Sequence, residues 1–394
     1  ICRSGDLAIN TLWAWMAALG VSRETGLVSP AYGVYRQRDE SNFHPEYIDF
    51  LLRTQPYATE YRCRSTGITT SRLRLYPIDF LRIPLVQPPR DEQEMIVNYL
   101  RRQDTLVRKF IRNRRRLIEV LSEQKQAIIN QAVTRGLDPT GPLKPSGVEW
   151  IGDVPEHWDI LKLRTLFKQH GSGTTPSGNE YYGGDIPWVM TGDLNDTILN
   201  TTQRTVTPQA LSDFSALRLY PVGSLLVALY GATIGKTGVL AMDACTNQAC
   251  CVLAEPQDGV NARYIQAVVL VGKQHLVNQS YGGGQPNINS EIVRSLRVPL
   301  PPRDEQNQIL AAIERQTCDL DSAVATADRE IDLIREYRAR LIADVVTGKL
   351  DIRHLDPPPD SLKADDVTEI DADEFDDELA DDEDAELVEE AENA

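Results

Sequence analysis

One hexapeptide occurs twice in this sequence. Residues 88–93 read PPRDEQ, and residues 301–306 repeat all six letters. Further pairs are separated by the same distance along the chain: Ile96 and Ile309, Leu121 and Ile334, Ile128 and Leu341, and Val133 and Val346. A constant offset that holds from the hexapeptide to Val346 without a gap indicates a duplicated unit, and a duplication constrains the fold more strongly than any local pattern.

A weaker likeness precedes each hexapeptide. With a slightly larger constant offset, Gly5 aligns with Gly223, and residues 29–31 align with residues 247–249. The repeated unit is therefore a globular segment that differs between the two copies, followed by a helical segment that is much more similar in both. Because residue 1 corresponds to roughly residue 219, we expect the first copy to lack its front part, the equivalent of residues 145–218.

Each hexapeptide predicts the start of a long helix. Two prolines suit a helix start, where their missing N–H groups would have no partner, and the following Asp and Glu face the positive end of the helix dipole. No further Pro or Gly interrupts residues 90–135 or residues 303–347. Apolar residues recur at heptad-like spacing, at Ile96, Leu100, Val107, Phe110, Leu117, Leu121 and Ile128, and at Ile313, Leu320, Ala327, Ile334 and Leu341. A helix over residues 90–135 would be about 70 Å long, which is typical of a coiled coil.

The charges of the two helical segments are opposite. Residues 90–135 carry 11 basic and 6 acidic residues, whereas residues 303–348 carry 6 basic and 10 acidic residues. Opposite charge favours pairing of the two helices with each other over pairing of each with its own copy. Antiparallel pairing would place the two globular segments at opposite ends, as a dumbbell with pseudo-two-fold symmetry.

The globular segment over residues 144–300 contains short β-like runs, broken by Gly and Pro, and one predicted helix over residues 262–279. This pattern predicts an α+β fold. The net charge of −17 belongs to residues 356–394, which hold 19 acidic residues and one basic residue. The rest is nearly neutral and can hold basic patches for nucleic acid. The acidic tail is predicted to be a disordered, solubilising segment, or else to imitate the charge of DNA.

Several classes of protein are excluded by what the sequence lacks. The six cysteines form no C-x-x-C pair and no metal-ligand spacing, and the five histidines show no spacing typical of a catalytic triad or a metal site. No run approaches the ~20 apolar residues of a membrane span, and the first residues lack the pattern of a signal peptide. We therefore expect a reduced, cytoplasmic protein without metal ligands or catalytic residues.

Six motifs accompany the repeat: KPSGVEWIGDVPEHW at residues 144–158, GSGTTP at 171–176, IPW at 186–188, GDL at 192–194, GATIGK at 231–236 and QPNIN at 285–289. As a set, over roughly residues 1–352, they resemble the specificity (S) subunit of type I restriction-modification systems. The resemblance implies two target recognition domains, the first incomplete here, that each read one half of a split double-stranded DNA sequence. It also implies that the paired helices fix the gap between the halves and dock two methyltransferase (M) subunits.

The resemblance implies no catalysis by this chain. Adenine methylation and ATP-driven cleavage would belong to the M subunits and the restriction (R) subunits, with S-adenosylmethionine, ATP and Mg²⁺ as their cofactors. The domains expected on this basis are a truncated first recognition domain (1–87), a first spacer helix (88–138), a second recognition domain (139–300), a second spacer helix (301–352) and an acidic tail (353–394). Alternatives are a coiled-coil scaffold that does not read DNA and a non-functional fragment of an S subunit.

Polar segments of the second recognition domain supply the candidate DNA contacts: Ser172, Thr174, Thr175, Arg204, Lys236, Gln285, Asn287 and Asn289. Gln and Asn can bond adenine through two hydrogen bonds, Ser and Thr can serve bases or phosphates, and the two cations suit phosphates. The alternative for residues 171–176 is a plain polar turn. For residues 282–289 it is a cap in which Asn287 and Asn289 satisfy backbone groups.

Two further motifs have competing interpretations. GATIGKT at residues 231–237 is one residue short of a phosphate-binding P-loop, which favours a turn within the recognition domain. The basic run on the first helix, comprising Arg112, Arg114, Arg115 and Arg116, is a candidate contact for DNA phosphates between the half-sites. Its alternative is a solvated helix face or a set of partners for acids on the second helix.

Overall fold

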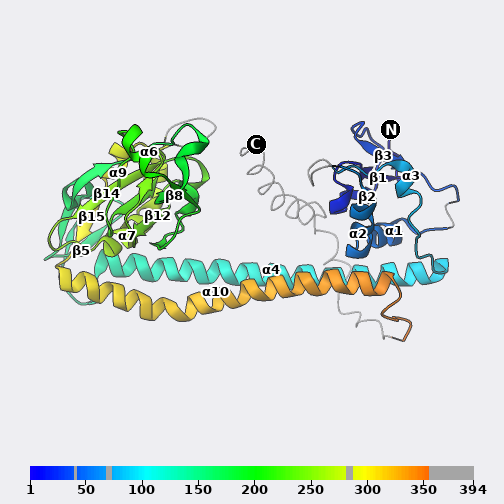
Figure 1. Cartoon of the computed structure of the whole chain (residues 1–394). Coiled ribbons are helices and arrows are strands. Elements are labelled where there is room, and N and C mark those ends of the chain that lie inside the picture. The colour runs from blue at the N-terminus through cyan, green and yellow to red at the C-terminus, as the bar shows by residue number, and fades with distance from the viewer. Residues whose placement is uncertain (40–41, 68–72, 281–286, 355–394) are drawn as a thin grey trace. The chain divides into compact units, whose positions relative to one another are not determined.

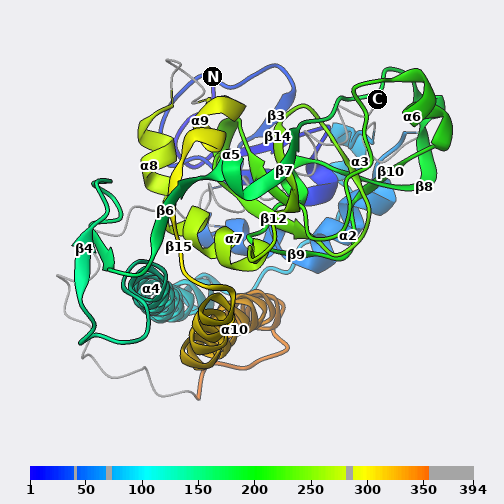
Figure 2. The same cartoon turned by 90° about the vertical axis from the view of Figure 1, so that its left-hand side faces the viewer.

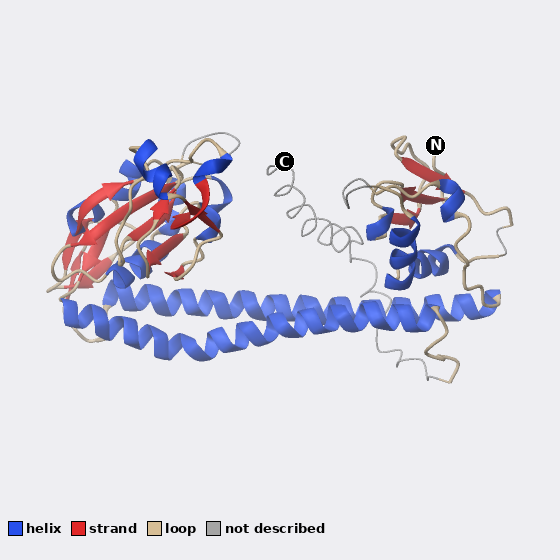
Figure 3. Ribbon diagram, viewed as in Figure 1, coloured by secondary structure: helices blue, strands red, loops and turns tan. Residues whose placement is uncertain are grey.

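The computed structural model describes residues 1–39, 42–67, 73–280 and 287–354. Its chain divides into two compact units, which we name Unit 1 (Ile1–Arg116 and Ala327–Ala394) and Unit 2 (Leu117–Thr326) (Figure 1). Each unit combines a globular part with segments of the two long helices. Both contain helices and sheets, which confirms the predicted α+β class (Figure 3). No described helix has the length and apolar character needed to cross a lipid bilayer.

Unit 1 has a three-stranded antiparallel sheet in the order β2-β1-β3. Its elements besides the long helices are β1 (Leu7–Asn10), β2 (Leu19–Val21), β3 (Tyr32–Tyr35), α1 (Pro45–Leu52), α2 (Gln55–Arg64) and α3 (Pro77–Phe80). Tyr47, Leu51 and Tyr61 from α1 and α2 are fully buried in its core. The same core takes in the start of one long helix and the end of the other, so the long helices are integral to this unit.

Unit 2 has a five-stranded sheet in the order β7-β14-β11-β12-β9, a three-stranded sheet in the order β10-β8-β13 and two small two-stranded sheets. Its strands are β4 (Leu143–Pro145), β5 (Asp153–Pro155), β6 (Asp159–Lys162), β7 (Phe167–Gly171), β8 (Tyr182–Val189), β9 (Thr197–Leu199), β10 (Arg204–Val206), β11 (Leu225–Ala228), β12 (Thr237–Leu240), β13 (Cys245–Thr246), β14 (Cys250–Pro256) and β15 (Arg297–Leu300). Its helices are α5 (Leu163–Leu166), α6 (Pro208–Asp213), α7 (Ala262–Val271), α8 (Lys273–Asn278) and α9 (Ser290–Ser295). The buried side of α7 packs on β11 and β12.

The duplication predicted from the sequence is confirmed by the strand register. In Unit 1, Leu7 of β1 lies opposite Val21 on one side and Tyr35 on the other. In Unit 2, Leu225 of β11 lies opposite Val239 and Leu253. Each member of the second set follows its counterpart at the same offset that relates Gly5 to Gly223. The two units therefore share one strand arrangement as well as one sequence pattern.

The two predicted long helices are present as α4 (Arg90–Arg135) and α10 (Arg303–Val346). In Unit 1, Asp104 and Arg114 of α4 pair with Arg338 and Glu330 of α10, so the partner number falls as the α4 number rises. These segments are therefore antiparallel. In Unit 2, the end of α4 and the start of α10 share the core below α7 and β15 (Figure 2).

The predicted apolar seam between α4 and α10 is partly confirmed. Leu100 and Val107 of α4 and Ala327 and Leu341 of α10 are buried, whereas Leu117 of the same heptad-like pattern is 38% exposed. Charged pairs also join the two helices: the largely buried Asp104–Arg338 pair interrupts the seam, whereas the more exposed pairs Arg114–Glu330 and Lys125–Asp321 lie beside it. Polar side chains within such a seam fix the register of a coiled coil at a cost in stability.

The Asp104–Arg338 pair is expected to couple the two helices measurably. Both carboxylate oxygens of Asp104 accept from the guanidinium, at 2.7 and 2.9 Å, and the side chains are only 16% and 27% exposed. A double-mutant cycle with Asp104→Ala and Arg338→Ala, followed by urea unfolding, should give a coupling energy of about 1–2 kcal/mol. The exposed Glu336–Arg340 pair on α10 is the control and should give under about 0.5 kcal/mol. Equal coupling in both pairs would contradict the assigned seam.

The single helix predicted over residues 262–279 is wrong, because the structure has two helices, α7 and α8, that meet at Gly272. The backbone leaves the helical region there, with φ −75° and ψ 0°. A β-carbon on Gly272 would lie 3.2 Å from the ring of Trp150, so the glycine allows this indole to approach the chain. The break is therefore set by a contact with a residue that lies far earlier in the sequence.

Candidate nucleic-acid interface

One end of the five-stranded sheet in Unit 2 collects the polar loops that the sequence singles out. Strand β14 is antiparallel to both β7 and β11, and β11 is antiparallel to β12. Hence β7 and β11 end where β12 and β14 begin. The loops at this end are residues 172–176, 229–236 and 247–249. They carry the candidate residues Ser172, Thr174, Thr175 and Lys236.

Two buried aromatic side chains hold the backbone of the 172–176 loop. The Tyr220 hydroxyl donates to the carbonyl oxygen of Ser172 at 2.9 Å, and the indole Nε1 of Trp188 donates to the carbonyl oxygen of Thr174 at 3.2 Å. Burial raises the pKa of Tyr220, so its phenol stays protonated as a donor. Because the anchors bind main-chain oxygens, they fix the path of the loop without occupying the side chains of Ser172 and Thr174.

A glycine is required in this loop. The backbone of Gly173 passes so close to the chain of Thr246 that a β-carbon would lie 1.6 Å from the Thr246 carbonyl oxygen. The next exposed side chain, Thr175, donates from its hydroxyl to Oε1 of Gln248 at 2.8 Å. The sequence reasoning missed Gln248 as a candidate contact. A signal existed, since residues 247–249 align with residues 29–31 but differ in their side chains at the first two positions, as expected of a variable reading loop.

The segment that begins at residue 287 reaches the same end of the sheet. Asn287 forms an isolated β-bridge with Tyr230, and the amide of Ile288 donates to the carbonyl oxygen of Leu229 at 3.0 Å. The side-chain oxygen of Asn289 accepts from the amide of Ile292 at 2.9 Å and caps α9. For Asn289 this is the backbone-satisfying role that the sequence offered as the alternative. The candidate Gln285 lies outside the described residues.

The two candidate cations lie on different elements. Arg204 is exposed on β10, directly opposite Trp188 of β8, the residue that anchors the 172–176 loop. Lys236 is half-buried at the end of the turn between β11 and β12, which includes a short 3₁₀ segment and Gly235 at φ +73°. The P-loop-like motif is therefore a turn within the sheet, as the sequence predicted.

The basic run on α4 includes one arginine that pairs with the second long helix. Arg114 pairs with Glu330 at 2.7 Å, and its guanidinium carbon lies 4.9 Å from the centre of the Phe110 ring. The predicted alternative, a partner for acids on the second helix, is confirmed for this residue. Arg112, Arg115 and Arg116 are exposed on the same turns of α4.

The groups at and near this sheet end suit hydrogen bonding. Burial raises the pKa of Cys251 on β14, and of Cys245 on β13, to about 11, which leaves both as neutral thiols. His170 on β7 has a lowered pKa, chiefly because burial penalises the charged imidazolium. Hydroxyl, amide and cationic groups on a rigid sheet end can serve base edges and phosphates.

Comparison with known proteins identifies the domain that carries this surface. Residues 155–321 match the family model of the type I restriction modification DNA specificity domain. The chain is 29% identical to the type I restriction enzyme MjaIX specificity subunit of Methanocaldococcus jannaschii over 170 residues, which cover 41% of this chain and 38% of that protein. It is 22% identical to the MjaVIII specificity subunit of the same organism over 78% of this chain and 71% of that protein.

A solved structure shares the fold. One chain from work on the structural basis underlying complex assembly and conformational transition of the type I R-M system superimposes with a TM-score of 0.64. The match covers 89% of this chain and 83% of that chain at 16% sequence identity. At this identity the match shows a shared fold. Residues 155–321 thus resemble a type I restriction modification DNA specificity domain, and the chain is similar to type I restriction enzyme specificity subunits.

Proposed function

We propose that this chain is the DNA sequence-specificity subunit of a type I restriction-modification complex and reads a bipartite DNA target. The observation that carries the proposal is the convergence of residues 172–176, 229–236, 247–249 and 287–289 at one end of a rigid sheet. This end lies within the residues that match the DNA specificity domain. The chain supplies no catalysis of its own.

The roles of the contacts follow from their chemistry. Ser172, Thr174, Thr175 and Asn287 would face base edges, because hydroxyl and amide groups both donate and accept hydrogen bonds. Arg204 and Lys236 would bind phosphates, together with the exposed arginines at the centre of α4, where positive charge acts without regard to sequence. Arg114 already pairs with Glu330, so its charge is partly neutralised.

The finer architecture that we propose comprises recognition domains at residues 1–87 and 139–300, spacer helices at 88–138 and 301–352, and a tail from 353. The two recognition domains would lie at opposite ends of the paired helices, as a pseudo-two-fold dumbbell. The shared strand register and the opposite charges of the helices support this arrangement. M subunits would dock on the helices and R subunits on the complex, in the cytoplasm, and bring S-adenosylmethionine, ATP and Mg²⁺.

The test compares two substitutions in the complex with its M subunit, after methylome sequencing has identified the target. Lys236→Ala should weaken binding to every DNA sequence and lower the slope of log affinity against log salt by about 1. Asn287→Ala should cost about 1–3 kcal/mol on the cognate half-site and little on others. Fluorescence anisotropy across a salt series measures both effects.

Asn278→Ala is the matched control, because Asn278 is an exposed asparagine at the end of α8, outside the candidate interface. Its affinity should equal that of the unmodified complex for all sequences. A complex that binds or methylates no particular sequence would reject the proposed function and favour a scaffold that does not read DNA.

A further inference from the structure

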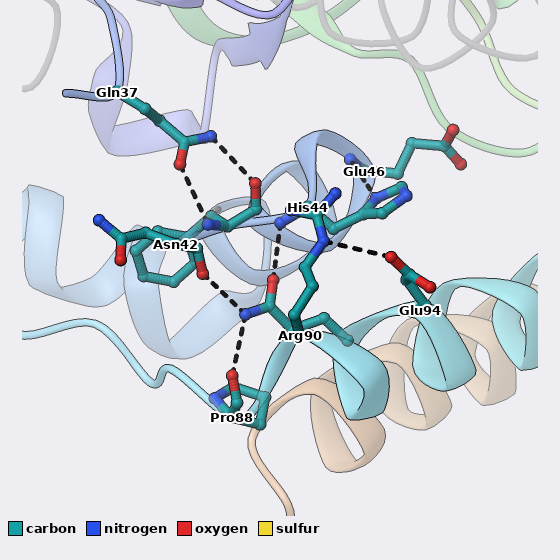
Figure 4. Close-up of polar contacts among 9 residues, drawn as sticks. Gln37, Asn42, His44, Glu46, Pro88, Arg90 and Glu94 are labelled. Carbon is teal, nitrogen blue, oxygen red and sulfur yellow. Dashed lines mark hydrogen bonds and ion pairs between the residues drawn. The ribbon is translucent and has the colours of Figure 1, made fainter. Parts of the chain in front are cut away.

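A fully buried glutamine joins the start of α4 to the globular part of Unit 1. Gln93, the last residue of the first hexapeptide, has 0% exposure. Its Oε1 accepts from the backbone amide of His44 at 2.7 Å, and its Nε2 donates to the carbonyl oxygens of Asn42 and Pro88, each at 2.9 Å (Figure 4). His44 is the N-cap of α1. One amide therefore ties the start of a short helix to the start of a long one.

Gln306 makes the same connection in Unit 2. It is also fully buried, and its Oε1 accepts from the amide of Asn261, the N-cap of α7, at 2.8 Å. Its Nε2 donates to the carbonyl oxygens of Gly259 and Pro301, at 2.9 and 2.8 Å. All the partners are main-chain groups, which is why different side chains, such as His44 and Asn261, can occupy equivalent positions.

A tyrosine on each short helix binds the end of the other long helix. In Unit 1, the Tyr47 hydroxyl of α1 donates to the carbonyl oxygen of Val346 in α10 at 3.0 Å. In Unit 2, the Tyr264 hydroxyl of α7 donates to the carbonyl oxygen of Val133 in α4 at 3.3 Å. Burial raises the pKa of both phenols, which keeps them protonated as donors.

Each short helix is thus fixed at both of its connections to the long helices. We name this arrangement the junction, formed by Gln93 and Tyr47 in Unit 1 and by Gln306 and Tyr264 in Unit 2. In Unit 2, α7 packs directly on β11 and β12, the strands joined by the turn that carries Lys236. A change of angle at the junction would therefore tilt the candidate nucleic-acid interface relative to the helix segments of its own unit.

A gain in folding stability is a weak explanation for a buried glutamine such as Gln93 or Gln306. Burying an amide costs desolvation that its hydrogen bonds largely offset, so the net gain is only about 1 kcal/mol per bond. A buried polar group with every partner satisfied does, however, select one geometry over alternatives, because any other packing leaves it unpaired. Two copies of this geometry, in units whose other side chains differ, indicate a requirement for a fixed angle.

We propose that Gln93, Tyr47, Gln306 and Tyr264 are positioning residues that fix the angle of each recognition domain on the helices and thereby restrict the gap accepted between the two half-sites. The inference rests on the proposed function. One added base pair moves a half-site by about 3.4 Å and rotates it by about 35°, so a rigid junction excludes the wrong gap. A loosened junction tolerates it.

The test measures gap preference separately from sequence preference. Once the target is known, the complex with its M subunit methylates DNA duplexes that keep both half-sites and change the gap by one base pair in either direction. Gln306→Ala and Tyr264→Phe should each reduce the preference for the native gap by about tenfold, the scale of effects between hydrogen-bonded neighbours. The ranking of half-site sequences at the native gap should stay unchanged.

Matched controls are Gln308→Ala and Tyr337→Phe, since both side chains are exposed on α10, Tyr337 by 50%. They should keep the native gap preference. Tyr264→Phe removes a single hydroxyl and serves as the decisive variant if Gln306→Ala does not fold. Equal loss of methylation at all gaps, with gap preference intact, would overturn the inference and leave the junction a purely stabilising element. An unmodified complex without sequence-specific methylation would reject the proposed function itself.

Discussion

Replacing Leu100 with alanine is expected to lower the free energy of unfolding of Unit 1 by about 2–5 kcal/mol. Leu100 lies on α4 with 1% exposure, in the same core as Leu341 and Val345 of α10. Removing its side chain loses the transfer free energy of the buried carbons and leaves a cavity between two helices that are fixed by the junction and by the Asp104–Arg338 pair. The helices cannot close this cavity cheaply.

Urea unfolding followed by circular dichroism measures the loss, with hydrogen exchange in β1–β3 to identify the transition that belongs to Unit 1. Leu106→Ala is the control on the same helix, because Leu106 is 40% exposed and should cost about 1 kcal/mol or less. Similar losses for Leu100 and Leu106 would show that the two helices do not pack through this face.

The long helices were predictable because their signals are local. Two prolines followed by Asp and Glu mark each start, and Gly136 and Gly348 follow the ends of α4 and α10. Two charged positions along the helix pair, Asp104 and Lys125, were missed for the opposite reason. A charged residue does not fit an apolar heptad pattern, and the positions of these two are explained only by Arg338 and Asp321, which are distant in the chain.

The candidate interface was predicted as motifs but not as a surface. GSGTTP and GATIGK stand out because glycines permit close approach and left-handed turns, as Gly173 and Gly235 do here. The two motifs lie at the same end of the sheet because β7, β14 and β11 pair in antiparallel order, and no local sequence pattern specifies that pairing. Trp188 and Tyr220 were missed as loop anchors, since an aromatic residue in the sequence gives no sign that its polar atom binds a distant carbonyl group.

The junction, too, was visible in the sequence as a motif but not as a set of contacts. The hexapeptide was the strongest repeat in the sequence, yet its prolines and acids already explain a helix start, so Gln93 and Gln306 attracted no separate role. Their function is visible only once the N-caps of α1 and α7 lie beside them. One signal could have identified these two glutamines. The two prolines and the acidic residues are enough to start a helix, so a glutamine repeated beside them needs another explanation.

Trp158 joins both long helices in Unit 2, and its loss should be the most severe single change in that unit. The indole is fully buried, and its Nε1 donates to Oε1 of Glu305, near the start of α10, at 3.1 Å. Its ring also packs against Gly136 just after the end of α4, where a β-carbon would lie 3.2 Å from it and where φ is +74°. Trp158→Ala should therefore lower the free energy of unfolding by about 3–5 kcal/mol.

A graded series separates the two contributions of this side chain. Trp158→Phe keeps much of the apolar volume but removes the donor to Glu305, so it should cost about 1–3 kcal/mol, less than alanine does. Trp13→Ala is the matched control, because Trp13 is 42% exposed, and its cost should stay near 0.5 kcal/mol, roughly the scale of surface substitutions. Calorimetry on the three variants gives the order. If alanine and phenylalanine at position 158 were equally destabilising, the packing of the ring would contribute little, and most of the effect of Trp158 would come from its bond to Glu305.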